Sequence, residues 1–425
     1  MRGLIVRGRG GGSDGVPAPA PTARTTTRQT GRWGLVAACF ALMTVTSGVW
    51  YTASVFFVAF VDDFGWDYSS TSSIFSLFTI LYGVSGVLVG MVADRMGVRR
   101  VILGGGALLV VALFGNSLAT ARWHLYVTHS TLVALGLAGM GWVPVSILLA
   151  RGFQERRGLA LGLASSGVGV GIMVFVPLAQ IMIDRIGWRS AFVVLAVISA
   201  AVTFPVGLFA VRGRTAPPAA AADSRPPPPG RTLASALRGR SFWLVSASFL
   251  LLNAPVQMIL THQVAYLVEV GQPKAFVAGV VGLVGLLSAP GKVLWGWLSD
   301  RWWIESTYSA AIALLVGGIF ALLAVGPGTE AWGLYGYALL MGFGYAVAPA
   351  MTPILSARFF AGGSFGAIFG ALNLLHHTGG AFGVWLAGYS HDLTGSYVLS
   401  LRASIASVCL ALACVSLAAP RRLAR

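Results

Sequence analysis

The sequence predicts an all-α integral membrane protein with twelve transmembrane helices in two pseudo-symmetric six-helix bundles. The first observation is composition, since 56% of the 425 residues are hydrophobic and only 10% are charged. Soluble domains are about 25% charged, and so apolar a chain could not cover a soluble surface with polar groups. The second is a series of apolar runs close to the roughly 20 residues that span a bilayer. The third is a Pro- and Arg-rich segment that divides the chain in two.

The expected organisation along the chain follows these runs. Residues 1–32 lack the apolar core of a signal peptide and are expected to be a disordered cytosolic tail. An N-terminal bundle (33–211), a cytosolic linker (212–240), a C-terminal bundle (241–419) and a cytosolic tail (420–425) follow. The predicted spans are 33–60, 70–93, 101–119, 123–150, 159–183, 189–211, 242–268, 276–298, 307–325, 332–357, 364–388 and 396–419.

The charge distribution predicts the orientation. The formal net charge is +16, and most basic residues fall in the tails, the linker and the loops of one side. The opposite loops hold only Arg122, Arg185, Arg189 and Lys274. The positive-inside rule therefore places both termini in the cytosol. No interleaving of basic and aromatic residues typical of single-strand binding occurs, so a nucleic-acid partner is not expected.

A short motif recurs after the second span of each predicted half. "GMVADRMGVRR" occupies Gly90–Arg100 and "GWLSDRWW" occupies Gly296–Trp303, and both read G-x-x-x-D-R. Two halves repeated in this way are typical of secondary transporters.

These motifs resemble the loop motif of the major facilitator superfamily, G-x-L-a-D-R-x-G-R-[RK]. The resemblance implies the major facilitator fold over the whole chain except the tails and the linker. It also implies that the motif latches the two halves on the cytosolic side in one conformational state. The alternative is a simple charged turn. The implied gating residues are Gly90, Asp94, Arg95, Gly97, Arg99, Asp300 and Arg301, with Arg100 completing the first motif.

Three further segments narrow the resemblance. "RGFQERRGLALGLASSGVGVG" (Arg151–Gly171), "GWRSAF" (Gly187–Phe192) and "DFGW" (Asp63–Trp66) resemble the patterns of monocarboxylate transporters and oxalate/formate-type exchangers. Bacterial relatives share these patterns, so the resemblance implies a multi-pass protein of the cytoplasmic (inner) membrane of a bacterium.

Lys292 is a cation inside the eighth predicted span. It lies eight residues before Asp300, about 12 Å along a helix of 1.5 Å rise per residue. A lysine at the centre of a membrane costs about 2.5–3.5 kcal/mol, so such a residue is expected to face a cavity and a partner. All 13 acidic residues fall in loops, tails or helix ends, so the expected partner is an anionic substrate. The alternative is snorkelling to the cytosolic headgroups.

The resemblance to monocarboxylate transporters also bears on Lys292, because those proteins carry a basic residue four positions before the motif glycine. Two residues of this chain differ from those of the animal monocarboxylate transporters. Ser288 stands where those proteins have an aspartate, and Tyr51 stands where they have a functional lysine.

Other polar and aromatic residues are candidates for the substrate cavity. His376 in "NLLHHTGG" is expected at mid-depth as an anion ligand and as the proton-coupling group, because histidine titrates near neutral pH. His377 and His262 are less favoured for coupling, and a structural role for His376 stays open. The remaining substrate-binding candidates are Tyr51, Trp142, Asn253, Gln257 and Tyr345, for which helix packing is the alternative.

The predicted function is secondary active transport of small organic anions, in particular monocarboxylates, by alternating access and proton symport. Anion exchange, transport of drugs or other solutes, and a non-transporting membrane sensor are the alternatives. No enzyme activity is expected, and no G-x-x-x-x-G-K-[ST] motif supports ATP-driven pumping. No cofactor or metal site is expected, since Cys39, Cys409 and Cys414 lie in apolar runs without nearby ligands. The expected partners are the substrate, a proton and the bilayer, and the chain is expected to be a monomer.

Overall fold

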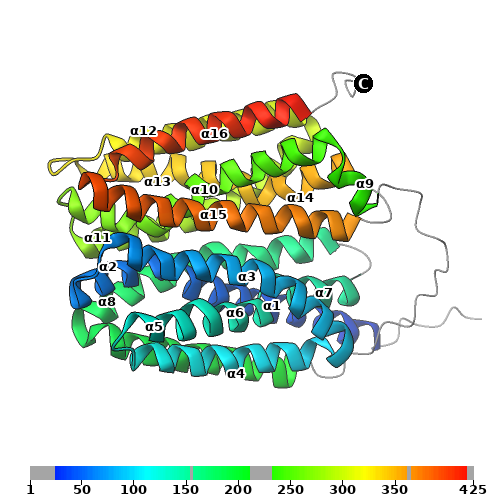
Figure 1. Cartoon of the computed structure of the whole chain (residues 1–425). Helices are drawn as coiled ribbons and strands as arrows, with labels where there is room; N and C mark the ends of the chain where they lie inside the picture. The colour runs from blue at the N-terminus through cyan, green and yellow to red at the C-terminus, as the bar shows by residue number, and fades with distance from the viewer. Residues whose placement is uncertain (1–23, 154–156, 211–231, 361–364, 419–425) are drawn as a thin grey trace, which may run out of the picture.

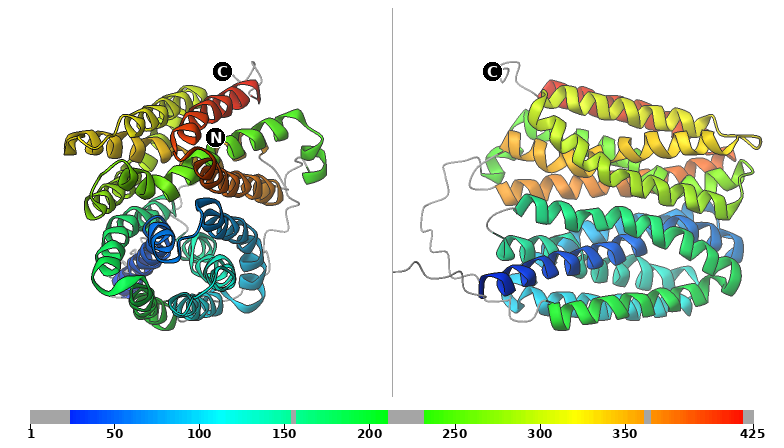
Figure 2. Two further views of the ribbon diagram at one scale, coloured as in Figure 1. Left: turned by 60° about the vertical axis from the view of Figure 1, so that its left-hand side comes forward. Right: turned by 180° about the vertical axis from the view of Figure 1, so that it is seen from behind.

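The computed structural model describes residues 24–153, 157–210, 232–360 and 365–418. In this part of the chain all regular structure is helical, as expected. The helices run side by side along one axis, with the N-terminal half below and the C-terminal half above (Figure 1). Views from the side and from behind give the same division into two bundles (Figure 2).

The N-terminal half contains the helices up to residue 210. Several membrane passes consist of more than one helix, because short irregularities interrupt them. The elements are α1 (Arg24–Tyr51), α2 (Ala53–Phe64), α3 (Tyr68–Met96), α4 (Val98–Ser117), α5 (Arg122–Leu125), η1 (Tyr126–Val133), α6 (Ala134–Met140), α7 (Trp142–Gly152), α8 (Arg157–Pro205) and η2 (Val206–Ala210).

The C-terminal half begins with a short helix in the predicted linker. The elements are α9 (Leu233–Leu237), α10 (Arg240–Glu269), α11 (Lys274–Arg301), α12 (Ile304–Leu323), α13 (Ala331–Tyr345), α14 (Val347–Phe360), α15 (Phe365–Thr394) and α16 (Val398–Ala418).

The described helices account for twelve passes through a membrane. Ten runs are long and apolar enough to span one. The run Ala160–Phe209 turns at Gly187, whose φ of 78° is a left-handed conformation that favours glycine, so it crosses twice. The 30-residue helix α15 is also long enough to cross, although its polar residues lower its hydropathy. The twelve-span, all-α prediction is confirmed.

The ends of the predicted domains differ in detail from the structure. Helix α1 begins at Arg24, inside the segment expected to be a disordered tail, because its polar first turns continue the apolar helix beyond the membrane. The remainder of that tail, most of the linker and the C-terminal tail lie outside the described residues.

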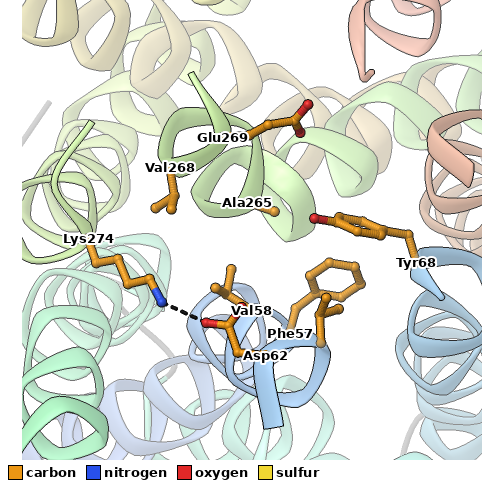
Figure 3. A pocket seen from close by; sticks show the side chains of 9 residues that line it. Phe57, Val58, Asp62, Tyr68, Ala265, Val268, Glu269 and Lys274 are labelled. Atoms are coloured by element: carbon orange, nitrogen blue, oxygen red, sulfur yellow. Dashed lines mark hydrogen bonds and ion pairs between the residues drawn. The ribbon is translucent and has the colours of Figure 1, made fainter. Parts of the chain in front are cut away.

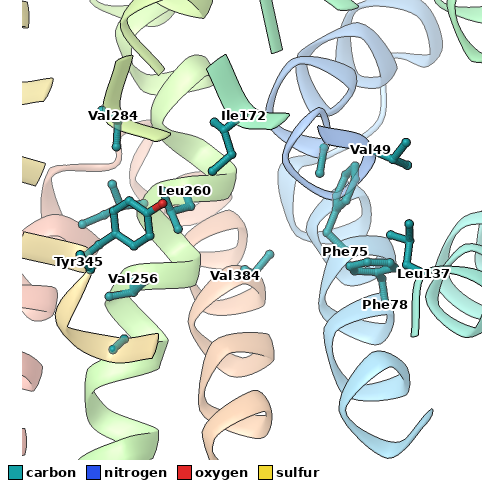
Figure 4. Packing of buried hydrophobic residues seen from close by; sticks show 14 of the residues in the cluster. Val49, Phe75, Phe78, Leu137, Ile172, Val256, Leu260, Val284, Tyr345 and Val384 are labelled. Atoms are coloured by element: carbon teal, nitrogen blue, oxygen red, sulfur yellow. The ribbon is translucent and has the colours of Figure 1, made fainter. Parts of the chain in front are cut away.

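Glycines let helices within each half pack at backbone distance. A methyl group at Gly105 of α4 would lie 2.9 Å from the carbonyl oxygen of Gly136 on α6, and one at Gly344 of α13 would lie 2.6 Å from Leu315 Cα on α12. In membranes, where lipid is as apolar as the helices, such close contacts stabilise a bundle. Phe75, Leu137 and Leu260 are among the apolar side chains that fill each half between the helices (Figure 4).

Two helix pairs join the halves. Helix α3 packs along α15, and α8 packs along α11. Because these pairs come from the second and fifth passes of opposite halves, the interface has the pseudo-symmetry expected of a two-fold repeat.

Candidate functional site

The interface between the halves positions the candidate site, so its two ends are defined first. The inner side is the end that carries the Gly90–Arg100 motif, which the charge distribution predicts to be cytosolic. The outer side is the opposite end.

Gly83 of α3 meets His377 of α15, where a methyl group on the glycine would lie 2.9 Å from His377 Cβ. In the other helix pair, a methyl group on Gly169 of α8 would lie 3.2 Å from Ala289 Cβ of α11. Gly83 and Ala289 each lie seven residues before their motif glycine, so the two crossings are pseudo-equivalent.

The outer side of the interface is closed by polar contacts. Lys274 Nζ lies 2.7 Å from Asp62 Oδ2, and Asp392 accepts hydrogen bonds from the backbone N–H groups of Tyr68 (2.9 Å) and Ser69 (2.8 Å). The Tyr68 ring stacks on His391 with 3.9 Å between ring centroids. We name the residues that make these cross-half contacts the outer gate: Asp62, Tyr68, Ser69, Lys274, His391 and Asp392.

A small cavity opens within the outer gate. It has a volume of about 160 Å³, and its lining comes from α2, α3, α10 and α11. Lys274 and Asp62 meet on one side of it, and Glu269 and Tyr68 lie on the other (Figure 3). The cavity therefore lies between the two halves.

Deeper along the interface, His262 of α10 continues the outer contacts. Its Nε2 lies 3.0 Å from the carbonyl oxygen of Val384 and 3.4 Å from Ser72 Oγ of α3, and its Nδ1 lies 3.0 Å from Tyr397 Oη. A carbonyl only accepts, so Nε2 carries the hydrogen and Nδ1 accepts from Tyr397 in the neutral ring.

The inner side of the interface is open by comparison. Methyl groups built on Gly162 of α8, Gly296 of α11 or Gly370 of α15 would meet no atom within 4 Å. Further outward on the same three helices, methyl groups on Gly169, Gly285 and Gly388 would clash with the opposite half. The described interface is therefore closed outside and open inside, which is an inward-facing arrangement.

Lys292 lies where the interface begins to open. Gly282, Gly285 and Ala289 form the stripe of α11 that contacts α8, and Lys292 continues this stripe at helical spacing one turn further inward. The side chain is half-buried, and within the described part of the chain it has no hydrogen bond or ion pair. At the pseudo-equivalent position of α3, four residues before Gly90, the residue is Gly86, so the cation belongs to one half only.

Tyrosines gather next to this stripe. Tyr345 at the end of α13 lies beside Ser288, which is one turn outward of Lys292, and close to Tyr51 of α1. Tyr345 is only 2% exposed, and its hydroxyl faces the Ser288 side chain. Tyr51 and Gln257 line a second, very small cavity with Trp50, Ala53, Leu260 and Thr261. Three of the predicted site residues are therefore neighbours at the centre of the interface.

The two neighbouring histidines of α15 face different helices. Asn253 of α10 donates a hydrogen bond to the backbone carbonyl of His376 at 2.8 Å, and the His376 ring packs edge-on to Phe249 of the same half. His377 instead faces α3, with its ring 5.8 Å from the Tyr82 ring. The structure thus places His376 and Asn253 within the C-terminal half and His377 at the interface.

Trp142 follows a break in the fourth pass. Gly141 has non-helical dihedral angles (φ −82°, ψ −145°) and separates α6 from α7. The Trp142 side chain is 44% exposed and lines neither cavity described above. It is not brought together with Tyr51, Gln257 and Tyr345.

The motif residues lie at or near the inner ends of α3 and α11, except that Arg99 lies in the first turn of α4. Arg99 Nε donates to the carbonyl oxygen of Gly207 at 2.9 Å, within the N-terminal half, and Gly97 has a φ of 84°. Arg301 lies over the Trp297 ring of its own helix at 4.1 Å. Arg95 is exposed and Gly90 only just reaches Val143, while the side chains of Asp94 and Asp300 lie outside the described part.

Several interface residues were not predicted from the sequence. Tyr82 packs edge-to-face on Trp50 at 4.4 Å, and Asn373 shares the α15 face of His377 one turn further inward. One signal was available, because Tyr82 and Ser288 both lie eight residues before their motif glycine. No comparable signal marks the outer gate, whose partners are far apart in the chain.

Comparisons with known proteins agree with this geometry. Residues 38–384 match the model of the Major Facilitator Superfamily. The chain is 27% identical to monocarboxylate transporter 12-B of Danio rerio, covering 86% of this chain and 82% of the relative. It is 29% identical to monocarboxylate transporter 13 of Bos taurus, covering 87% and 84%.

A solved structure has the same fold. The inward-facing, occupied crystal structure of a bacterial homologue of the human lysosomal transporter Spinster superposes with a TM-score of 0.70. The sequence identity is 16%, and the match covers 92% of this chain and 96% of that one.

Proposed function

The chain belongs to the Major Facilitator Superfamily, and we propose that this transporter carries small organic anions, in particular monocarboxylates, by proton symport. It is a multi-pass integral membrane protein of a family of transporters and not of enzymes. Its similarity to monocarboxylate transporters of vertebrates supports the proposed substrate class. We propose the cytoplasmic membrane of a bacterium as its location and a monomer as its functional unit.

The observation that carries the proposal is the position of Lys292. It continues the stripe of α11 that contacts the other half, it lies at the start of the inner opening, and it lacks a partner among the described residues. A cation in such a place is costly unless an anion neutralises it. A carboxylate bound to Lys292 would form a charge-assisted hydrogen bond, the stronger kind.

The neighbouring tyrosines suit the rest of a small organic acid. The Tyr345 hydroxyl is buried beside Ser288, and a tyrosine hydroxyl can donate a hydrogen bond to a bound carboxylate. Tyr51 and Gln257 line the adjoining cavity and would contact the substrate when the halves close around it. We keep Trp142 and Asn253 as weaker candidates, since Trp142 is remote from this cluster and Asn253 already bonds to His376.

A histidine of α15 is the proposed proton-coupling group. Among the described residues, no carboxylate lies in the middle of a span, so a histidine is the side chain that can change charge there near neutral pH. His376 remains the candidate from the sequence. His377 joins it because it faces the other half, and a group there can respond to the movement of the halves.

We also propose that the inner motifs control switching. They lie on the side where the interface is open, at or near the inner ends of α3 and α11 or, for Arg99, at the beginning of α4: Gly90, Asp94, Arg95, Gly97, Arg99, Asp300 and Arg301. Contacts between the motif and the opposite half would form when the inner side closes.

The test is uptake into proteoliposomes of labelled lactate, pyruvate, oxalate, formate and branched 2-oxo acids, with and without a pH gradient. Accumulation driven by an inward proton gradient supports symport. Exchange that needs an internal anion and ignores the gradient would replace symport by anion exchange. Transport of none of these acids would reject the substrate class.

A further inference from the structure

We propose that His391 is a proton-binding site of the outer gate, and that proton binding there and closure of the gate favour each other. The site takes its proton from the outer aqueous phase. It is separate from the substrate-binding region around Lys292, and it does not depend on which solute is carried.

The position of His391 gives it access to both halves and to water. Its Nε2 lies 3.1 Å from Glu269 Oε2 in the same half, and its side chain is 12% exposed. One ring face stacks on Tyr68 of the N-terminal half, with 3.9 Å between centroids and 24° between planes. The ring therefore connects a carboxylate of one half to an aromatic ring of the other.

The charges around the gate are balanced except at Glu269. Asp62 pairs with Lys274, and Asp67 pairs with Arg122 at 3.3 Å. Asp392 accepts from two N–H groups at the beginning of α3, where the helix dipole favours negative charge. Glu269 has His391 as its only partner among the described residues, so its charge is neutralised only when His391 is protonated.

Closure of the gate makes this imbalance unfavourable. It brings Asp62 of the N-terminal half to the cavity that Glu269 of the C-terminal half also lines. Like charges at short range repel, and a protonated His391 reduces this repulsion. The imidazolium also gains a cation–π contact with Tyr68, which exists only when the gate is closed.

The other titratable groups near His391 do not replace it. His262 of α10 is connected through Tyr397, whose ring lies 4.5 Å from that of His391, and its neutral form already satisfies both ring nitrogens. Tyr266 of α10 packs against Tyr397. Lys274 is engaged by Asp62. Since the Glu269 contact lies within one half, it does not depend on closure, whereas Tyr68 and Asp62 of the other half make proton binding depend on closure.

Reciprocity fixes the sign of the effect. If closure strengthens proton binding, then acid on the outer side strengthens closure by the same factor. A cation–π contact at an exposed site changes an equilibrium by about two- to fivefold. We therefore expect the ratio of closed to open outer gate to rise by at least that factor between about pH 8 and pH 5.5.

The experiment measures the distance between spin labels on the outer ends of the halves, without substrate, in lipid nanodiscs. The labels are attached at Ile186→Cys and Glu330→Cys after replacement of Cys39, Cys409 and Cys414. The wild-type gate should become more closed as the pH falls. The His391→Gln variant should lose this response. The His391→Arg variant, which carries a permanent cation, should be more closed at every pH.

Two controls sharpen the result. His124→Gln changes another half-buried histidine of the outer side, whose ring accepts hydrogen bonds from N–H groups of its own loop, and should respond as wild type. Glu269→Gln should move the response to lower pH, because the proton loses its carboxylate partner. Monodisperse elution of each variant verifies folding.

The proposal is overturned if the wild-type distance does not depend on pH, or if His391→Gln responds as wild type. Both outcomes are independent of substrate. The gate proposal can therefore fail while anion transport is observed, and anion transport can be rejected while the gate still responds to pH.

Discussion

Gly388 of α15 lies directly against Ser72 of α3 in the closed outer gate, so that a methyl group on the glycine would be 2.2 Å from Ser72 Oγ. It would also be 2.6 Å from the backbone carbonyl oxygen of Tyr68, which cannot rotate away. The closed state therefore requires the absence of a side chain at this position.

We predict that Gly388→Ala hinders closure of the outer side. Overpacking typically costs about 1–3 kcal/mol, so the ratio of closed to open states should fall roughly five- to 150-fold. The spin-label distances described above measure this ratio. Gly370→Ala on the same helix is the matched control, because its methyl group would meet no atom within 4 Å. Equal behaviour of the two variants would contradict the assignment of this contact to the closed gate.

The ion pair between Asp62 and Lys274 should favour the closed gate modestly. Both side chains are partly exposed, and such pairs contribute about 0.2–1 kcal/mol. Asp62→Lys and Lys274→Asp should each open the gate, and the double variant should restore closure in a double-mutant cycle. Additive effects without restoration would show that the pair does not couple the halves.

Lys292→Gln should greatly reduce anion binding and transport while leaving the bundle folded. Loss of a hydrogen bond to a charged group costs about 1.5–3 kcal/mol, which is roughly 10- to 150-fold in affinity. Lys292→Arg should keep part of the transport because the charge remains. Binding is measured by calorimetry and transport by uptake into proteoliposomes. Unchanged uptake by the Gln variant would remove Lys292 from the binding site.

The two adjacent histidines allow a direct comparison of coupling. The variant that removes the proton-coupling group should lose accumulation driven by a pH gradient and retain counterflow of labelled against unlabelled anion. His376→Gln and His377→Gln are assayed on matched preparations. If both variants still accumulate substrate under a pH gradient alone, neither histidine carries the proton, and anion exchange becomes the better model.

Asp67 should stabilise the beginning of α3 in a pH-dependent way. It is the N-cap, and hydrogen bonds from Ser70 hold the pKa of its carboxyl at about 2. A lowered pKa in the folded state means that the stabilisation is present above the unfolded value near 4 and is lost as the pH falls towards 2. Asp67→Ala should destabilise the protein by about 1 kcal/mol at neutral pH, measured as a shift in Tm.

Asp67→Asn serves as the control for this prediction, since an asparagine retains the cap and loses only the ion pair with Arg122. It should change Tm less than Asp67→Ala does at neutral pH. An equal loss of stability in both variants would show that Asp67 stabilises the protein through its charge and not through helix capping.

Periodicity, charge and motif spacing were sufficient for the architecture. The bilayer restricts spanning segments to long apolar helices, so the passes could be read directly. The depth of Lys292 followed from its distance to Asp300, because the rise of a helix is constant. The separate spans 159–183 and 189–211 were predicted as well, and the structure places the turn between them at Gly187 of α8.

Side-chain direction was harder to predict than depth. His376 and His377 are neighbours in the sequence, and helix geometry separates their directions by about 100°. Which one faces the other half depends on how α15 rotates against α3 and α10, and that rotation is set by close contacts such as Gly83 with His377.

The sequence by itself determined the twelve-helix membrane architecture, its two repeated halves and the presence of a cation inside a span, because each depends on local composition and spacing. Only the tertiary structure decided that the outer side is closed, and that His391, Glu269 and Tyr68 meet there. Asp62 lies 212 residues from Lys274, and Tyr68 lies 324 residues from Asp392. Contacts between such distant residues follow from the packing of one half on the other, which no pattern within a single helix specifies.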